Sequence, residues 1–114
     1  MSICRVLALR FHPVLPTTET FVLINSGTGF IGEDVKKKSA FMYSTVELED
    51  GVVMIMNNFF FIPTLLPNRV VDGKLINGVF YIVKKAPNGD FESISSELSE
   101  KYREIFKDSY ISSK

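Results

Sequence analysis

The feature that most restricts the fold of this chain is a series of short apolar, β-branched and aromatic runs that are separated by turn residues. Runs of this length and composition are typical of β-strands, whereas helices need longer segments with a period near 3.6 residues. The predicted strands are Ile3 to Phe11, Thr20 to Asn25, Ala40 to Leu48, Val52 to Ile62 and Asn77 to Lys85. The chain between Pro63 and Asp72 is predicted to be a long connection.

The pair Asp50-Gly51 predicts a hairpin between two of these strands, because it can supply the positive φ angles of a tight turn. A two-residue loop fixes the register of the strands that it joins. The expected partners are Glu49 with Val52, Val46 with Ile55, and Met42 with Phe59.

In the last segment the apolar residues recur with the period of a helix. One stripe of that helix would contain Leu98, Tyr102, Ile105 and Phe106. Ser95 or Ser96 is expected to cap its N-terminus. The sequence therefore predicts an α+β fold: a mostly antiparallel sheet of about five strands, with one C-terminal amphipathic helix packed on it. With 114 residues, of which 46% are hydrophobic, we expect a single domain over residues 1–114. The order of the strands is not readable from the sequence.

Charge and composition exclude several classes of function. Basic and acidic residues number 13 each, so no overall field attracts nucleic acid or an anionic membrane. The apolar runs are far shorter than the roughly 20 residues that span a bilayer, and Arg5 and Arg10 interrupt the apolar N-terminal run, unlike a secretory signal. We therefore expect a cytoplasmic protein.

One cysteine and one histidine exclude an internal disulfide and a multi-cysteine or multi-histidine zinc site. Cys4 is predicted to be a small core residue, and His12 a structural or surface residue. The carboxylates are scattered, without a pair of inferable geometry, so we expect no enzyme, no metal and no cofactor.

The segment Gly27-Thr28-Gly29-Phe30-Ile31-Gly32 follows a predicted strand and matches the start of a dinucleotide-binding fingerprint. Glu33 and Asp34 would, however, repel a pyrophosphate there, and residues 35–44 lack the apolar stripe of a helix that packs on a sheet. A surface loop is the favoured interpretation. Lys36, Lys37 and Lys38 follow and could bind phosphate, but a solvated turn or short helix is the favoured interpretation.

The run Phe59-Phe60-Phe61-Ile62 places Phe59 and Phe61 on one face of a strand and Phe60 on the other. A central strand, covered on both faces, explains this pattern. The alternative is an aromatic patch at an interface with a partner or a second copy.

Several ordered segments of the C-terminal half carry a family resemblance. They are Leu66-Pro67-Asn68-Arg69, Asp72-Gly73, Ile76 to Val83, Phe91 to Ser95, and Glu97 to Tyr102 with Phe106. Through them, residues 66–106 resemble a family of small uncharacterised proteins from phages, prophages and conjugative elements, known only as a domain of unknown function. The N-terminal half departs from the family, because Asn57-Asn58-Phe59-Phe60-Phe61 stands where such proteins tend to have a short acidic, glycine-bearing turn.

The resemblance implies an accessory protein of a mobile element, with Asn68 and Arg69 as the polar residues most like the family pattern. An arginine fork suits a carboxylate, a phosphate or a cluster of backbone carbonyls, and an asparagine can hold a turn. Asn68 and Arg69 therefore either bind a partner or ligand, or brace a loop.

We expect a non-enzymatic binding module that inhibits a host defence or regulatory protein. The alternative is a sponge for a nucleotide-like signal, which would use Gly27, Thr28, Gly29, Lys36, Lys37, Lys38 and Arg69. A dinucleotide-dependent enzyme is the weakest of the three hypotheses. A homodimer through an edge strand is compatible with each of them.

Overall fold

The computed structural model describes residues 3–25, 29–33, 43–57 and 65–110. The strands are β1 (Ile3–Phe11), β2 (Thr18–Asn25), β3 (Gly29–Gly32), β4 (Tyr43–Glu49), β5 (Val52–Asn57), β6 (Pro67–Val71), β7 (Lys74–Asn77), β8 (Phe80–Lys85) and β9 (Phe91–Glu92). One helix, α1 (Ser96–Ile105), follows them. The predicted combination of a mostly antiparallel sheet with one C-terminal helix is confirmed.

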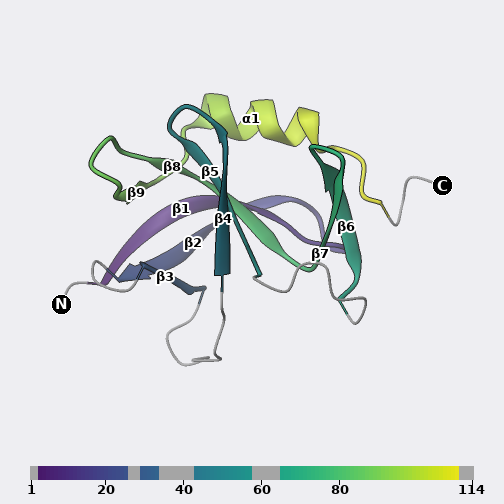
Figure 1. The fold of residues 1–114 in the computed structure, drawn as a ribbon, viewed down its shortest axis with the longest axis horizontal. Coiled ribbons are helices and arrows are strands. Elements are labelled where there is room, and N and C mark those ends of the chain that lie inside the picture. Colours follow the sequence, from purple (N-terminus) through teal and green to yellow (C-terminus); the bar gives the residue numbers. More distant parts are fainter. Residues whose placement is uncertain (1–2, 26–28, 34–42, 58–64, 111–114) are drawn as a thin grey trace.

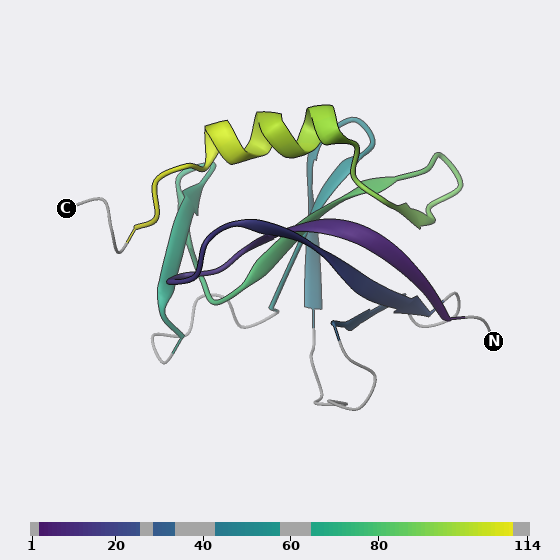
Figure 2. The ribbon, with the colours of Figure 1, turned by 180° about the vertical axis from the view of Figure 1, so that it is seen from behind.

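The main sheet has the strand order β3-β2-β1-β8-β5-β4, and β9 adds to β8. All of its pairs are antiparallel. A separate two-stranded sheet joins β6 to β7. Figures 1 and 2 show α1 lying across the main sheet, with β6 and β7 standing at one end of it.

The expected number of about five strands is wrong, because the described residues already form seven strands in the main sheet and two more in the second sheet. The prediction of a connection from Pro63 to Asp72 is wrong over Pro67–Val71, which forms β6. A turn at Asp72-Gly73 joins β6 to β7. Both turn residues have positive φ, 52° and 80°, as a tight hairpin of the type I′ class requires. The predicted strand from Asn77 to Lys85 is divided by Gly78, whose φ is +83°.

The hairpin at Asp50-Gly51 is confirmed, and Glu49 pairs with Val52 as predicted. Beyond that pair the predicted register is wrong, because Val46 lies opposite Met54 instead of Ile55. The register shifts between Glu47 and Glu49, where a β-bulge inserts Leu48 as an extra residue. The predicted pair Met42 and Phe59 lies outside the described residues.

The sheet buries side chains on both faces. On the face toward α1, the buried cluster includes Leu9, Phe11, Met54, Phe80, Ile82, Val71, Ile76 and Tyr102. On the opposite face it includes Val6, Ala8, Val22, Phe30, Ile55, Tyr81 and Val83. The two ends of the sheet approach each other over that second face, because the rings of Phe30 in β3 and Tyr43 in β4 are 5.7 Å apart. The sheet is therefore strongly curved.

Cys4 is exposed, so its assignment to the core is wrong. Its strand, β1, pairs with β8 only over Leu9–Phe11, and the first three residues of β1 are all exposed. The N-terminal end of β1 therefore extends beyond β8 and is left exposed.

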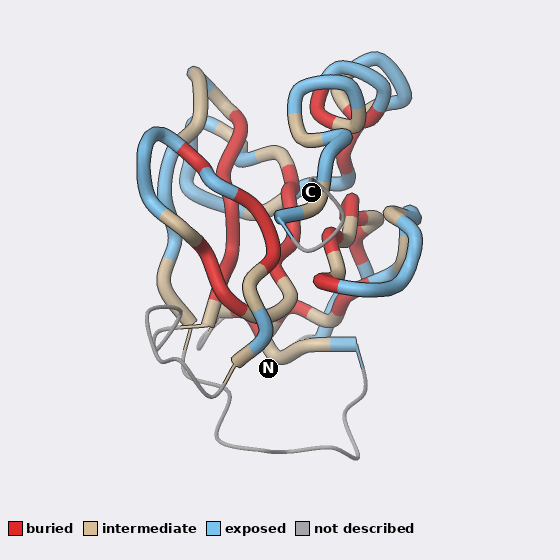
Figure 3. The backbone as a smooth tube through the Cα atoms, turned by 90° about the vertical axis from the view of Figure 1, so that its right-hand side faces the viewer, coloured by how far each residue is buried: buried red, intermediate tan, exposed pale blue. Residues whose placement is uncertain are grey.

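The helix begins where predicted, with the Ser95 hydroxyl accepting a hydrogen bond from the N–H of Leu98 at 3.3 Å. Tyr102 is buried, and Leu98 and Phe106 pack against the same cluster. Ile105 differs from the prediction, because 53% of its surface is exposed. Figure 3 shows the exposed outer side of the helix and the buried strands beneath it. Within the described residues, no helix has the length and apolar character that crossing a membrane would require.

Candidate functional site

Three of the residues that the sequence singles out lie in the described part of the chain: Gly29, Asn68 and Arg69. The other candidates, Gly27, Thr28, Lys36, Lys37, Lys38, Phe59 and Phe61, lie outside it.

Asn68 is completely buried in β6. Its side-chain amide donates hydrogen bonds to the backbone carbonyls of Phe11, at 2.9 Å, and Gly78, at 2.7 Å. Its own backbone carbonyl accepts from the N–H of Tyr110 at 2.7 Å. Asn68 thus joins β1, the β7–β8 connection and the segment after α1.

Arg69 is 5% exposed, and its guanidinium donates hydrogen bonds to other groups of the chain. Its Nε donates to the carbonyl of Phe106 at 2.7 Å, and Nη1 donates to Asn68 Oδ1 at 2.6 Å. Longer contacts reach the carbonyl of His12 and the hydroxyl of Thr17. Burial lowers the pKa of Arg69, and the Asp108 carboxylate opposes that shift.

We call these two side chains and their partners the Asn68–Arg69 cluster. Their donors are engaged with backbone carbonyls and with each other, which satisfies polar groups that would be costly to bury unpaired. This geometry favours the bracing interpretation of the pair over direct contact with a ligand.

His12 belongs to the same corner of the molecule. Its Nδ1 accepts hydrogen bonds from the backbone N–H groups of Val14 and Leu15, both at 3.0 Å. Burial and the charge of Arg10 lower the pKa of His12, whereas the charge of Glu33 raises it. The imidazole therefore holds the turn after β1.

Gly29 lies in β3, which is an antiparallel partner of β2. The dinucleotide fingerprint instead requires that its glycines lead from a strand into a helix. A Cβ atom built on Gly29 would lie 2.1 Å from the hydroxyl of Tyr43, so glycine is needed here for the close approach of β3 to β4.

A polar cluster that the sequence analysis missed lies near β3 on the face away from α1. Tyr81 donates a hydrogen bond to Glu33, and Arg10 Nη1 lies 3.7 Å from the same carboxylate. Arg10 and Tyr81 are opposite one another on β1 and β8. Burial, together with the bond to Glu33, raises the pKa of Tyr81. Arg10 Nε has no hydrogen-bond partner among the residues that the structure describes, but it is sealed from solvent, so this cluster ties β3 to β8 without presenting an open site.

An open groove lies between the edge strand β4 and the helix, and we call it the β4–α1 groove. It has a volume of ≈ 510 Å³ and is lined by Val46, Glu47, Leu48, Glu49, Val71, Asp72, Lys101, Tyr102, Ile105 and Phe106. The bulge in β4 forms part of the wall of this groove. Leu48 packs against the buried cluster on the α1 side, and the adjacent Glu49 contacts Tyr102 of the helix.

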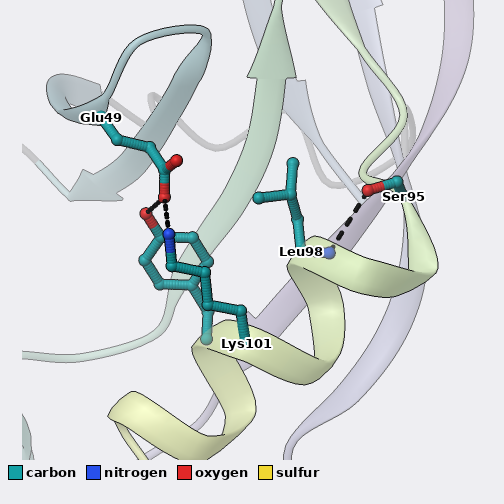
Figure 4. A network of polar contacts seen from close by, with 5 residues as sticks. Glu49, Ser95, Leu98 and Lys101 are labelled. Atoms are coloured by element: carbon teal, nitrogen blue, oxygen red, sulfur yellow. Dashed lines mark hydrogen bonds and ion pairs between the residues drawn. The ribbon is translucent and has the colours of Figure 1, made fainter.

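Glu49 fixes the distance between the two walls of the groove. Its Oε1 accepts hydrogen bonds from Tyr102 Oη and from Lys101 Nζ, the second at 2.7 Å (Figure 4). These bonds from Lys101 and Tyr102 lower the pKa of Glu49. Burial and the bond to Glu49 raise the pKa of Tyr102.

Exposed apolar side chains continue from the groove over the end of the helix. Val46 and Ile105 line the groove and are 41% and 53% exposed. A second hollow of ≈ 200 Å³ shares Ile105 and Phe106 with it and adds Val70 and Tyr110, which are 52% and 49% exposed. Four large apolar side chains therefore lie on one connected surface.

The sequence contained part of this site. The helical stripe in the sequence includes Ile105, but the stripe alone does not show that the sheet ends before reaching it. Val46 and Val70 gave no separate signal, because their exposure follows from the position of β4 at the end of the sheet and from the unpredicted β6. No group of three metal-ligating side chains comes together within the described ranges.

Searches against protein-family models, curated proteins and solved structures each found no match for this chain.

Proposed function

We propose that this protein is a non-enzymatic binding module of a phage or other mobile element, which attaches to a protein of its bacterial host through the β4–α1 groove. The observation that carries the proposal is the connected surface of four apolar side chains, Val46, Val70, Ile105 and Tyr110, which are 41% to 53% exposed. Contiguous exposed apolar surface of this kind marks interaction sites in soluble proteins.

The composition of the groove suits a protein partner. Apolar and aromatic groups line its centre, and charged groups, including Glu47, Asp72 and Lys101, are also present. Protein interfaces commonly combine an apolar, aromatic centre with a polar rim.

The polar groups of the groove support binding more than catalysis. Glu49, Lys101 and Tyr102 are bonded to each other and hold β4 against α1. A general base or nucleophile would instead be oriented toward a reacting group in the open site.

The mobile-element origin is supported by the resemblance of residues 66–106 to small proteins of phages, prophages and conjugative elements. A host defence or regulatory protein is the partner class that this origin favours. An accessory protein of this kind would act in the cytoplasm of the host.

The test is a phage-challenge assay in bacteria that carry individual defence systems, with this protein expressed from a plasmid. We expect it to restore phage growth against at least one system. Ile105→Glu places a charge on the groove and should abolish the rescue. Val14→Glu is the matched control, because Val14 is 65% exposed but does not line the groove.

Both variants should retain the wild-type melting temperature, since each changes an exposed side chain. Absence of rescue by the wild-type protein across a broad panel of systems would contradict the proposed role. Equal rescue by the two variants would show that the groove is not the binding surface.

A further inference from the structure

We propose that the occupant of the β4–α1 groove is an extended, basic segment of the partner protein, which adds to the sheet as a new strand beside β4. This inference rests on the proposed function and specifies the partner's chemistry.

The first argument is the position of β4. It ends the described strand order of the main sheet and pairs with β5 on one side. Edge strands present backbone donors and acceptors that can pair with a further strand. Tyr43 at the start of β4 already contacts Phe30 of β3, so the added segment would pair with the rest of the strand, toward Glu49.

The second argument is the coincidence of this edge with the groove. A strand added to β4 would lie about 4.8 Å from it. Alternate side chains of the added strand would face the α1 side of the sheet, where Val46 and Ile105 are exposed. Backbone pairing would then supply affinity, and the groove would select apolar side chains at every second position.

The third argument is charge. The groove contains three carboxylates, Glu47, Glu49 and Asp72, and one base, Lys101. Lys101 is paired with Glu49, which leaves the negative charges of Glu47 and Asp72 to act on an occupant. Lysine or arginine side chains on the added segment would complement these charges.

The same charges argue against a second copy of this chain as the occupant. Pairing β4 with another β4 would bring together two strands that each carry Glu47 and Glu49. Like charges on paired strands are destabilising, and charged edges are a common means of preventing self-association.

The experiment measures peptide binding to the full chain by titration calorimetry at low and at physiological salt. The probe is a nine-residue peptide in which valine and threonine alternate with lysine. One comparison peptide has glutamate for each lysine, and another has proline at its central position, which removes a backbone donor and disfavours a strand. We expect the lysine peptide to bind at least about tenfold more tightly than either comparison peptide.

Two charge-reversal variants locate the site. Glu47→Lys should weaken binding of the lysine peptide by about fivefold or more and reduce its salt dependence. Glu19→Lys is the matched control, because Glu19 is an exposed carboxylate on β2, away from the groove. Amide hydrogen exchange of Thr45 to Glu47 should slow when the peptide binds.

Equal binding of the proline peptide, or equal effects of the two variants, would overturn strand addition at β4. So would preferential binding of a basic helical peptide, or a concentration-dependent dimer that Glu47→Lys abolishes. If none of the strand peptides binds while phage rescue still depends on Ile105, the binding role stands and this inference fails. If the lysine peptide binds as expected but no rescue occurs, the mode of recognition stands and the proposed role in the host fails.

Discussion

Asn68 shows how one buried amide can determine the geometry of several segments. It contacts two backbone carbonyls that belong to β1 and to the β7–β8 connection, and its oxygen accepts from Arg69. Loss of this side chain would leave all three groups without that partner in a region closed to water. Buried polar groups that lose their partner cost far more than the net gain from making a hydrogen bond.

Asn68→Ala is therefore expected to lower the free energy of unfolding by about 3 kcal/mol. The measurement is urea denaturation followed by circular dichroism. Asn88→Ala is the control, because the Asn88 side chain bonds only to Asp90 in an exposed turn, and it should cost less than about 1 kcal/mol. Similar losses for the two variants would contradict the bracing role of Asn68.

At the scale of elements, the approach of β3 to β4 decides the curvature of the sheet. Gly29 and Tyr43 belong to strands at opposite ends of the strand order, and a methyl group on Gly29 has no room beside the Tyr43 hydroxyl. The contact therefore offers a direct test of whether the two edges meet.

Gly29→Ala is expected to cost about 3 kcal/mol of stability, from steric overlap and from the positive φ of 91°. In a Tyr43→Phe background the overlapping oxygen is gone, and the cost of the same change should fall by more than about 1 kcal/mol. Gly73→Ala controls for φ alone, since its φ is +80° and a Cβ there meets nothing within 4 Å. An unchanged cost of Gly29→Ala in the Tyr43→Phe background would show that the edges do not touch.

The elements also show what could be read from the sequence. The hairpin at Asp50-Gly51 and the Ser95 cap were predicted because turn and cap residues act locally. The hairpin at Asp72-Gly73 has the same dipeptide, but the prediction of a long connection from Pro63 to Asp72 leaves no strand before it. The structure has such a strand, β6, which begins at Pro67, where proline is tolerated as the first residue. The register beyond Glu49 was not predictable, because a bulge is set by packing of Leu48 against the helix rather than by alternation.

In the candidate site, too, local features could be predicted from the sequence and features set by distant packing could not. The family resemblance draws attention to Asn68 and Arg69, but a sequence does not show which distant carbonyls they meet. The groove depends on where the sheet ends and where the helix crosses it. Both are properties of the strand order, which no local pattern encodes.

At the scale of the whole molecule, the free energy of unfolding should be highest over a range of near-neutral to mildly alkaline pH and should fall on both sides of it. The pKa of His12 is lowered from 6.5 and that of Glu49 from 4.5, so in acid the unfolded chain binds protons before the folded chain does. Stability is then lost as pH falls below about 6.5, and further below about 4.5. The pKa values of Tyr81 and Tyr102 are raised from 10.0, so stability is lost as pH rises above about 10.

Urea denaturation between pH 4 and pH 11 checks this profile. His12→Asn keeps a side-chain acceptor for the turn but does not titrate, and it should flatten the step that begins near pH 6.5. Tyr81→Phe should reduce the alkaline loss, with the exposed Tyr110→Phe as its control. A His12→Asn profile that matches the wild type in acid would show that this imidazole does not contribute to the pH dependence.

The Asn68–Arg69 cluster has a consequence for how the chain is made. Asn68 is 57 residues from Phe11 along the sequence, and Arg103 donates to the carbonyl of Thr17 across 86 residues. On the ribosome, β1 therefore emerges long before β8, Asn68 or the segment after α1 exists to pair with it. Domains dominated by such distant contacts fold slowly, and their unpaired strands are open to aggregation until the segment after α1 has been synthesised. We expect the yield of folded protein to rise when translation is slowed or when chaperones that hold nascent chains are abundant.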